Sequence, residues 1–240
     1  MVVTGARPGS AADTYPSNTA LYADLAEGVD YARRFRRHAA LDDSNGPGDS
    51  YPDTAVVALH GGGIEPGTSE LCLAVAGYHP AGGTGGTVYD YWMFEGIRPS
   101  GNAALHVTSV HCDDPVALAT VAGSRRVLSL HGCSPAEAGL AADAAAVLVG
   151  RRDTGLKTAL LHAYRAAGVP AIDAAGVPAL NGEAAANIVN RNLSGAGVQL
   201  ELTTPLRTGM FGTNTRTRRK HTTLAGFWTF VNATRQALAG

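Results

Sequence analysis

The sequence is poor in cysteine and has no long apolar run. Three cysteines, Cys72, Cys112 and Cys133, stand among 240 residues, and none belongs to a CxxC pair. Their number and spacing exclude a disulfide scaffold, and we expect them to be small buried hydrophobic residues. No stretch reaches the roughly 18 to 20 apolar residues that a membrane span requires.

The chain also lacks an excess of charge of either sign. Its formal net charge is -1, which excludes a nucleic-acid binder that works through bulk positive charge. The opening residues MVVTGARPGSAADTYP contain no apolar core like that of a signal peptide. We therefore expect a soluble protein with neither nucleic acid nor membrane as its partner.

Strand and helix patterns alternate along the chain. Short apolar, β-branched runs predict strands at residues 54–59, 103–110, 125–130, 144–150 and 197–203. Helical spacing predicts helices at residues 18–38, 134–143, 153–167 and 222–239. The alternation predicts an α/β fold, a parallel or mixed sheet with helices on its faces. We expect one domain over residues 1–240, with 1–50 as a helical N-terminal extension and a core over about 51–240.

The segment HGGGIEPGTSE, residues 60–70, follows the first predicted core strand. Three glycines between His60 and Glu65 let the backbone turn tightly enough for both side chains to reach one zinc ion. A tight turn with no metal explains the spacing equally well. The HGGG run also supplies oxyanion amides in some esterases, but the chain has no GxSxG nucleophile motif.

Other polar residues stand in or near the ends of predicted strands. His111 and His131 end two of them, as His60 does, and ligands of α/β sheets bind at the carboxyl ends of strands. Two aspartates follow His111 and suggest an orienting partner. His106 is expected to be an interior histidine. Glu201 alternates with apolar residues, so it either faces a cleft or cation or lies on the exposed face of an edge strand.

Five segments together carry a family resemblance. HGGGIEPGTSE is followed by YWMFEG (91–96), LHVTSVHCDDP (105–115), SLHGC (129–133) and NRNLSGAGVQLEL (190–202). In this order they resemble the phage-type poly-γ-glutamate hydrolase family, over residues 54–205. The resemblance implies a zinc-carboxypeptidase-like fold, an open mixed β-sheet flanked by helices, and zinc-dependent hydrolysis of γ-glutamyl amide bonds.

The resemblance also implies residue roles. It makes His60, Glu65 and His131 the metal ligands and Glu201 the general base or acid. The residues agree with this assignment, because TAVVALHG and RRVLSLHG are two strands that both end in LHG. The rival hypothesis is a non-catalytic binding module that bears a metal. Only such a module would tolerate the loss of Glu201.

The implied substrate carries one free carboxylate per residue, so cationic side chains are expected near the metal. Arg191, with its neighbour Asn190, precedes the strand of Glu201, and Arg207 follows it. We predict that these residues and His111 bind substrate, although both arginines are equally compatible with solvated loops. The basic run RTRRK at residues 216–220 suits a polyanion or a solvated loop.

The sequence thus predicts a zinc hydrolase of poly-γ-glutamate in which Glu201 serves a metal-activated water. The alternative within the same class is an amidase or deacylase for another acidic amide, such as a cell-wall γ-glutamyl link. We expect an anionic γ-glutamyl polymer or peptide as partner, a monomer, and a cytoplasmic protein or a phage-encoded one released on lysis.

Overall fold

The computed structural model describes residues 13–38 and 53–240. Of the N-terminal extension predicted over residues 1–50, residues 1–12 and 39–50 lie outside these ranges. The strands are β1 (Tyr31–Arg36), β2 (Thr54–Gly62), β3 (Asp90–Gly96), β4 (Arg126–Cys133), β5 (Val147–Arg151), β6 (Ala171–Asp173) and β7 (Val198–Thr203). The α-helices are α1 (Asn18–Asp24), α2 (Thr68–Val75), α3 (Pro115–Ala122), α4 (Thr154–Ala166), α5 (Thr204–Thr208) and α6 (Ala225–Ala239).

The described strands form one open mixed sheet in the order β1-β3-β2-β4-β7-β5-β6. Strands β3, β2, β4 and β7 run parallel, whereas β1 pairs antiparallel with β3 and β5 pairs antiparallel with β7. The parallel strands at the centre are buried along almost their whole length, as expected for a sheet covered on both faces.

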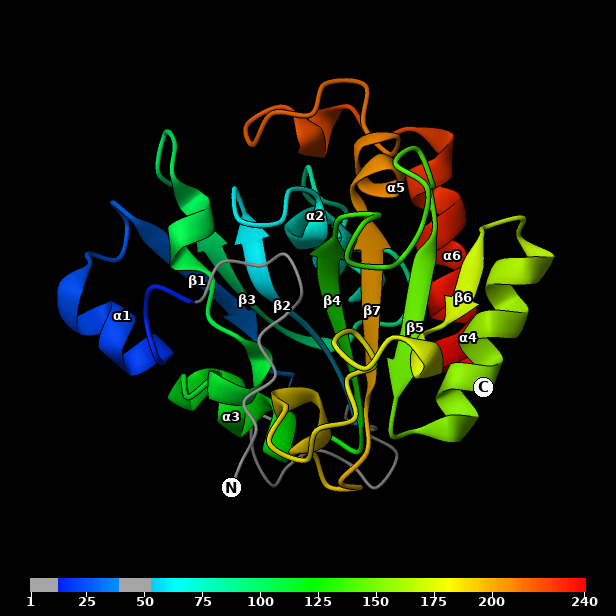
Figure 1. Cartoon of the computed structure of the whole chain (residues 1–240), viewed down its shortest axis with the longest axis horizontal. Coiled ribbons are helices and arrows are strands. Elements are labelled where there is room, and N and C mark those ends of the chain that lie inside the picture. Colours follow the sequence, from blue (N-terminus) through cyan, green and yellow to red (C-terminus); the bar gives the residue numbers. More distant parts are fainter. Residues whose placement is uncertain (1–12, 39–52) are drawn as a thin grey trace.

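Helices cover both faces of the sheet (Figure 1). Helices α2, α4 and α6 pack on one face, around apolar side chains such as Val56, Leu130 and Leu200. Helices α1 and α3 pack on the other face, against Val57 and Trp92. The predicted strands at 54–59, 125–130, 144–150 and 197–203 are confirmed as β2, β4, β5 and β7, and the helices at 153–167 and 222–239 are confirmed as α4 and α6.

The helix predicted over residues 18–38 is wrong after Asp24. Gly28 has a φ of 86°, and the Asp30 carboxylate accepts a hydrogen bond from the backbone N–H of Ala26, so the chain turns there. The following residues form β1, an edge strand of the sheet rather than part of a helical extension. Its aromatic residue Tyr31 stacks on Phe94 of β3 with 5.2 Å between ring centroids.

The strand predicted at residues 103–110 is also wrong, since two short 3₁₀ turns, η1 (Asn102–Leu105) and η2 (Ser109–His111), occupy this segment. Its backbone groups bond to side chains instead of a neighbouring strand. The Val107 carbonyl oxygen lies 2.9 Å from Nε2 of His60, and the Thr108 N–H donates to Asp13. These bonds hold the segment beside the end of β2.

The helix predicted at residues 134–143 does not form, although its start does. Ser134 and Glu137 make the reciprocal hydrogen bonds of a capping box. Gly139 then adopts a φ of 68°, and the Leu140 N–H donates to the Pro135 carbonyl, which closes the segment after one turn.

The three cysteines are buried and free, as predicted. Burial raises the pKa of each thiol, that of Cys112 to about 12. Over residues 13–38 and 53–240, no helix has the length and apolar character needed to cross a bilayer.

Candidate metal centre

The end of β2 turns His60 toward the α3 face of the sheet. Along an ideal strand His60 would share the opposite face with Ala58, because successive side chains alternate. The register between β2 and β3 shifts between Ala58 and Gly61, which is a β-bulge. Such a bulge re-aims the side chains that follow it. Leu59 packs in the hydrophobic core between the sheet and helices α1 and α3. The next residue, His60, is buried as well.

The glycine run brings Glu65 back over His60. Gly62 has a φ of 66°, and a Cβ added there would lie 2.4 Å from the Gly96 carbonyl oxygen, so this turn requires glycine. The Glu65 N–H then donates to the His60 carbonyl oxygen at 2.8 Å. The expectation of a tight turn is therefore confirmed, and it places both side chains together.

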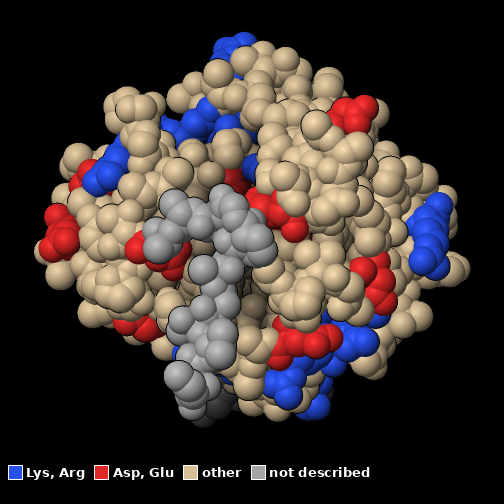
Figure 2. Space-filling view, viewed as in Figure 1, with Lys and Arg blue, Asp and Glu red and all other residues tan. Residues whose placement is uncertain are grey.

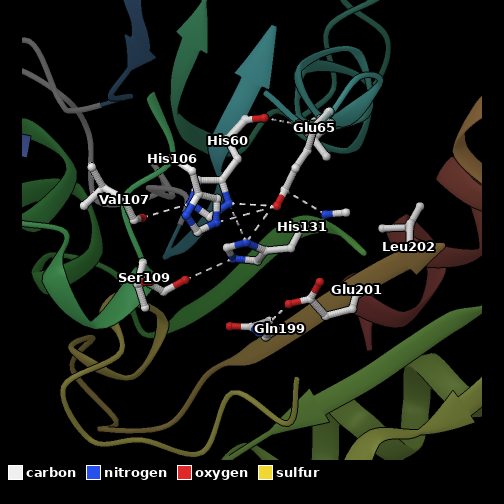
Figure 3. Close-up of polar contacts among 12 residues, drawn as sticks. His60, Glu65, His106, Val107, Ser109, His131, Gln199, Glu201 and Leu202 are labelled. Atoms are coloured by element: carbon white, nitrogen blue, oxygen red, sulfur yellow. Dashed lines mark hydrogen bonds and ion pairs between the residues drawn. The ribbon is translucent and has the colours of Figure 1, made fainter. Parts of the chain in front are cut away.

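His131 enters the same site from β4, the neighbour of β2. Its Nδ1 atom lies 3.1 Å from Nδ1 of His60. The next residue, Gly132, donates its N–H to Oε2 of Glu65 at 2.7 Å. Figure 3 shows the side chains of His60, Glu65 and His131 pointing toward one another.

The hydrogen bond of His60 leaves its other ring nitrogen facing the cluster. A carbonyl oxygen only accepts hydrogen bonds, so His60 donates from Nε2 to Val107. Its Nδ1 atom faces Oε1 of Glu65 and Nδ1 of His131, each 3.1 Å away. Electron-rich atoms this close are stable only with a cation or a proton among them.

The donor set fits zinc in particular. One ligand atom from each of His60, Glu65 and His131 lies within 4.8 Å of the other two. Two imidazoles and one carboxylate are a ligand set of catalytic zinc sites, and a fourth position then serves water or substrate. A metal-bound histidine commonly donates its other N–H to a backbone carbonyl, as His60 does to Val107.

Glu201 lies beside the cluster on β7, paired in register with His131. The possibility that it stands on an edge strand is excluded, since β7 lies between β4 and β5. Its Oε1 accepts a hydrogen bond from Nε2 of Gln199 at 2.8 Å, and Gln199 accepts one from Asn187, also at 2.8 Å. This relay fixes one carboxylate oxygen of a fully buried side chain.

The structure brings in residues that the sequence patterns missed. His106, expected to be an interior histidine, stacks on His60 with 3.8 Å between ring centroids and lies 2.6 Å from the Asp13 carboxylate. The Ser109 hydroxyl lies 3.5 Å from Nε2 of His131. Asp13 and His106 are 93 positions apart in the sequence, so no spacing pattern could have connected them.

Two of the predicted substrate residues are bonded within the protein. The guanidinium of Arg207 is buried and donates to the Leu202 and Pro66 carbonyl oxygens. Burial lowers its pKa, while the negative charge of Glu65 opposes this shift. Arg207 therefore braces the turn that carries Glu65.

The Asn190 amide likewise holds a loop together. It donates to the Gly182 and Ala184 carbonyl oxygens and accepts from the Gly197 N–H. Its donors and its acceptor are thus used inside the protein, and we expect any effect on substrate to act through the loop.

The other two predicted substrate residues are exposed on neighbouring turns. His111 ends η2, and Arg191 follows η4 (Ile188–Asn190), which packs against η2. The expectation that the aspartates after His111 orient it is wrong. Asp113 accepts from the Thr19 N–H, and Asp114 caps α3 and bonds Arg33. Substrate binding by His111 and Arg191 stays a prediction.

Comparison with known proteins agrees with the family resemblance of the sequence. A family model described as poly-gamma-glutamate hydrolase matches residues 19–233. The curated proteins to which the chain is similar include two from Bacillus subtilis strain 168. It is 33% identical to the UPF0714 protein YndL over 157 residues, 65% of this chain and 56% of YndL. It is 32% identical to the SPbeta prophage-derived UPF0714 protein YoqZ over 176 residues, 73% of this chain and 58% of YoqZ.

Two solved structures share the fold. A structure of bacteriophage poly-gamma-glutamate hydrolase superposes with a TM-score of 0.78 and 29% identity, over 95% of this chain and 97% of that one. The zinc-free apo form of YndL superposes with a TM-score of 0.79 and 27% identity, over 95% and 98%. The predicted fold class, a zinc-carboxypeptidase-like open mixed sheet flanked by helices, is confirmed.

Proposed function

This chain belongs to the poly-gamma-glutamate hydrolase family, and from that premise we propose that it hydrolyses γ-glutamyl amide bonds of poly-γ-glutamate at a zinc site. The observation that carries the proposal is the convergence of ligand atoms from His60, Glu65 and His131 beside the buried carboxylate of Glu201. That a structure of YndL is described as its zinc-free apo form supports zinc binding in a similar protein.

The three ligands would hold the metal from β2, the following turn and β4. When bound, zinc supplies polarisation of the scissile carbonyl and a water of lowered pKa, toward roughly 7. Glu65 also accepts from the Gly132 N–H, and His60 donates to Val107, so two of the ligands are oriented by backbone groups.

Glu201 would act as general base and then as general acid. Its carboxylate takes a proton from the attacking water and returns a proton to the leaving amine nitrogen as the C–N bond breaks. Gln199 holds one of its oxygens, which leaves the carboxylate in a fixed orientation during both transfers. Proton transfer by a positioned side chain contributes about 100-fold to 10,000-fold to a rate.

The test is hydrolysis of poly-γ-glutamate, measured as loss of polymer length and appearance of new amino groups. Chelation should abolish turnover, and added zinc should restore it. Glu201→Gln should lower kcat by about 100-fold or more while the protein retains one zinc per chain by metal analysis. Glu183→Gln, an exposed carboxylate paired with Arg151, is the matched control and should leave kcat unchanged.

Each part of the proposal has its own contradicting outcome. Turnover close to wild type in Glu201→Gln removes Glu201 as the base. Failure of His131→Ala to reduce the zinc content removes the metal assignment. Cleavage of muropeptides in place of poly-γ-glutamate changes the substrate to a cell-wall γ-glutamyl link.

A further inference from the structure

A cavity adjoins the glycine run of the candidate metal centre. It has a volume of about 550 Å³ and is lined by Gly63, residues 98–103, Arg216, Thr217 and Arg219. This volume is in the range of small-ligand sites, about 300–1,000 Å³. Gly63 belongs to the run between His60 and Glu65, so the wall of the cavity is continuous with the loop that carries two metal ligands.

The cavity joins segments that are distant in sequence. The turn after β3 supplies residues 98–103 and leads directly into the segment that contacts His60 and His131. The segment between α5 and α6 supplies the other side. Figure 1 shows both segments rising at the end of the sheet where β2 ends. Figure 2 shows Lys and Arg side chains in a hollow between protruding parts of this end of the molecule.

Three arginines and no acidic residue line the cavity. Two of them are fixed by carboxylates outside the lining. Arg98 donates to Asp30 at 2.8 Å, and Arg219 donates to Glu70 at 3.0 Å and to the Gly62 carbonyl oxygen at 2.7 Å. Burial raises the pKa of Glu70, and the charge of Arg219 opposes this shift. Arg219 therefore also braces the glycine run.

Arg216 differs from the other two arginines. It is exposed, and within residues 13–38 and 53–240 no carboxylate forms an ion pair with it. Its positive charge in the cavity is thus not offset by an ion pair with any carboxylate of the described residues. A guanidinium in this situation has its fork of N–H donors available for a carboxylate ligand.

We propose that this cavity is a subsite for a free α-carboxylate of the γ-glutamyl chain, with Arg216 as the residue that binds it. The proposal rests on the proposed function, because the cavity adjoins the glycine run that presents His60 and Glu65. A chain held there would have a carboxylate in the cavity and a neighbouring amide bond beside the metal ligands. One residue of the basic run at 216–220, Arg216, then has a specific role in binding substrate.

The test compares Arg216→Ala with Arg218→Ala. Arg218 belongs to the same run, is also exposed and makes no ion pair with the described residues, but it does not line the cavity. With zinc-loaded enzyme and poly-γ-glutamate, Arg216→Ala should raise KM about tenfold with kcat nearly unchanged, as expected for loss of a charged hydrogen bond made equally to substrate and transition state. Arg218→Ala should leave both constants close to wild type.

A binding measurement separates this proposal from the proposed function. In zinc-loaded Glu201→Gln protein, calorimetry with a short γ-linked glutamate oligomer should give a Kd that Arg216→Ala weakens about tenfold. Arg216→Lys should recover part of the affinity, since it keeps the charge without the planar fork. The same oligomer with its α-carboxylates methylated should bind both proteins equally.

The outcomes are distinguishable. Equal effects of Arg216→Ala and Arg218→Ala would overturn the subsite in favour of the bulk charge of the run. Unchanged KM and Kd in Arg216→Ala would overturn it while hydrolysis by the wild type leaves the function intact. Absence of hydrolysis in the wild type, with Arg216-dependent binding of the oligomer, would overturn the function and leave the carboxylate subsite standing.

Discussion

At the scale of single residues, the candidate site depends on hydrogen bonds that orient its chemical groups. His60 is fixed by the Val107 carbonyl, and Glu201 by the Gln199 amide. The buried Asn187 amide in turn holds Gln199. A buried carboxylate without such partners would be costly and free to rotate, so Gln199 is a positioning residue whose effect should appear in catalysis more than in substrate binding.

We predict that Gln199→Leu lowers kcat about tenfold or more and leaves KM and zinc content nearly unchanged. The substitution removes the amide that fixes one Glu201 oxygen, and misplacement of a catalytic group slows proton transfer. Steady-state kinetics and metal analysis check this. Asn192→Ala is the control, because Asn192 also braces a loop through the Arg125 and Ala196 carbonyl oxygens. An equal loss of kcat in that variant would assign the effect to general loosening.

At the scale of elements, segments without regular structure decide where the site residues lie. The bulge in β2 turns His60 onto one face, and the segment from η1 to η2 completes the other wall. Asp13 pins that segment through His106 Nδ1 and the Thr108 N–H, both at 2.6 Å. Burial opposes ionisation of Asp13, but these hydrogen bonds outweigh it and lower its pKa.

The lowered pKa of Asp13 predicts a pH-dependent contribution to stability. A carboxylate whose folded pKa lies below its unfolded value of 3.8 stabilises the protein above that pH and loses this contribution as the pH falls. Asp13→Asn should therefore reduce the free energy of unfolding by about 1–3 kcal/mol at pH 7. Below about pH 4 the difference from wild type should shrink, by at most about 1.4 kcal/mol per pH unit.

Urea denaturation of zinc-free protein between pH 7 and pH 3 measures this difference. Asp24→Asn is the control, since Asp24 is exposed and forms no ion pair with the described residues. A difference between wild type and Asp13→Asn that stays constant down to pH 3 would contradict the proposed origin in the Asp13 carboxylate.

At the scale of the whole molecule, the sheet brings three distant parts of the chain to one point. His60, His131 and Glu201 come from β2, β4 and β7, which are adjacent and parallel, so their carboxyl ends lie at the same edge. The helix layers bury both faces of these strands and keep the edge in a fixed shape. A metal bound there would link the strands directly and favour the folded state.

We predict that zinc raises the thermal midpoint Tm of the chelator-treated protein. A ligand present at 100 times its Kd stabilises the folded state by about 2.7 kcal/mol. Differential scanning calorimetry with and without zinc checks this. His131→Ala should abolish the rise, whereas His162→Ala, an exposed histidine on α4, should retain it. An undiminished rise in His131→Ala would place the zinc elsewhere.

The sequence alone determined the elements whose apolar pattern is regular. Local periodicity predicts the central strands β2, β4, β5 and β7 and the helices α4 and α6. A strand buried on both faces is apolar along its length, and a helix buried on one side has apolar residues at helical spacing. The family resemblance implied His60, Glu65 and His131 as a set, and the matching LHG ends agreed with it, whereas the HGGG turn alone was equally compatible with a turn that binds no metal.

Only the tertiary structure decided the rest. Residues 31–36 were predicted to be helical from their spacing, but they pair with the edge of β3 and form strand β1. His106, Asp13 and Gln199 acquire their roles through contacts with groups distant in sequence or across a buried face, as does the arginine cavity beside Gly63. The local sequence determines which structures each segment can adopt, but packing between segments determines which polar groups come into contact.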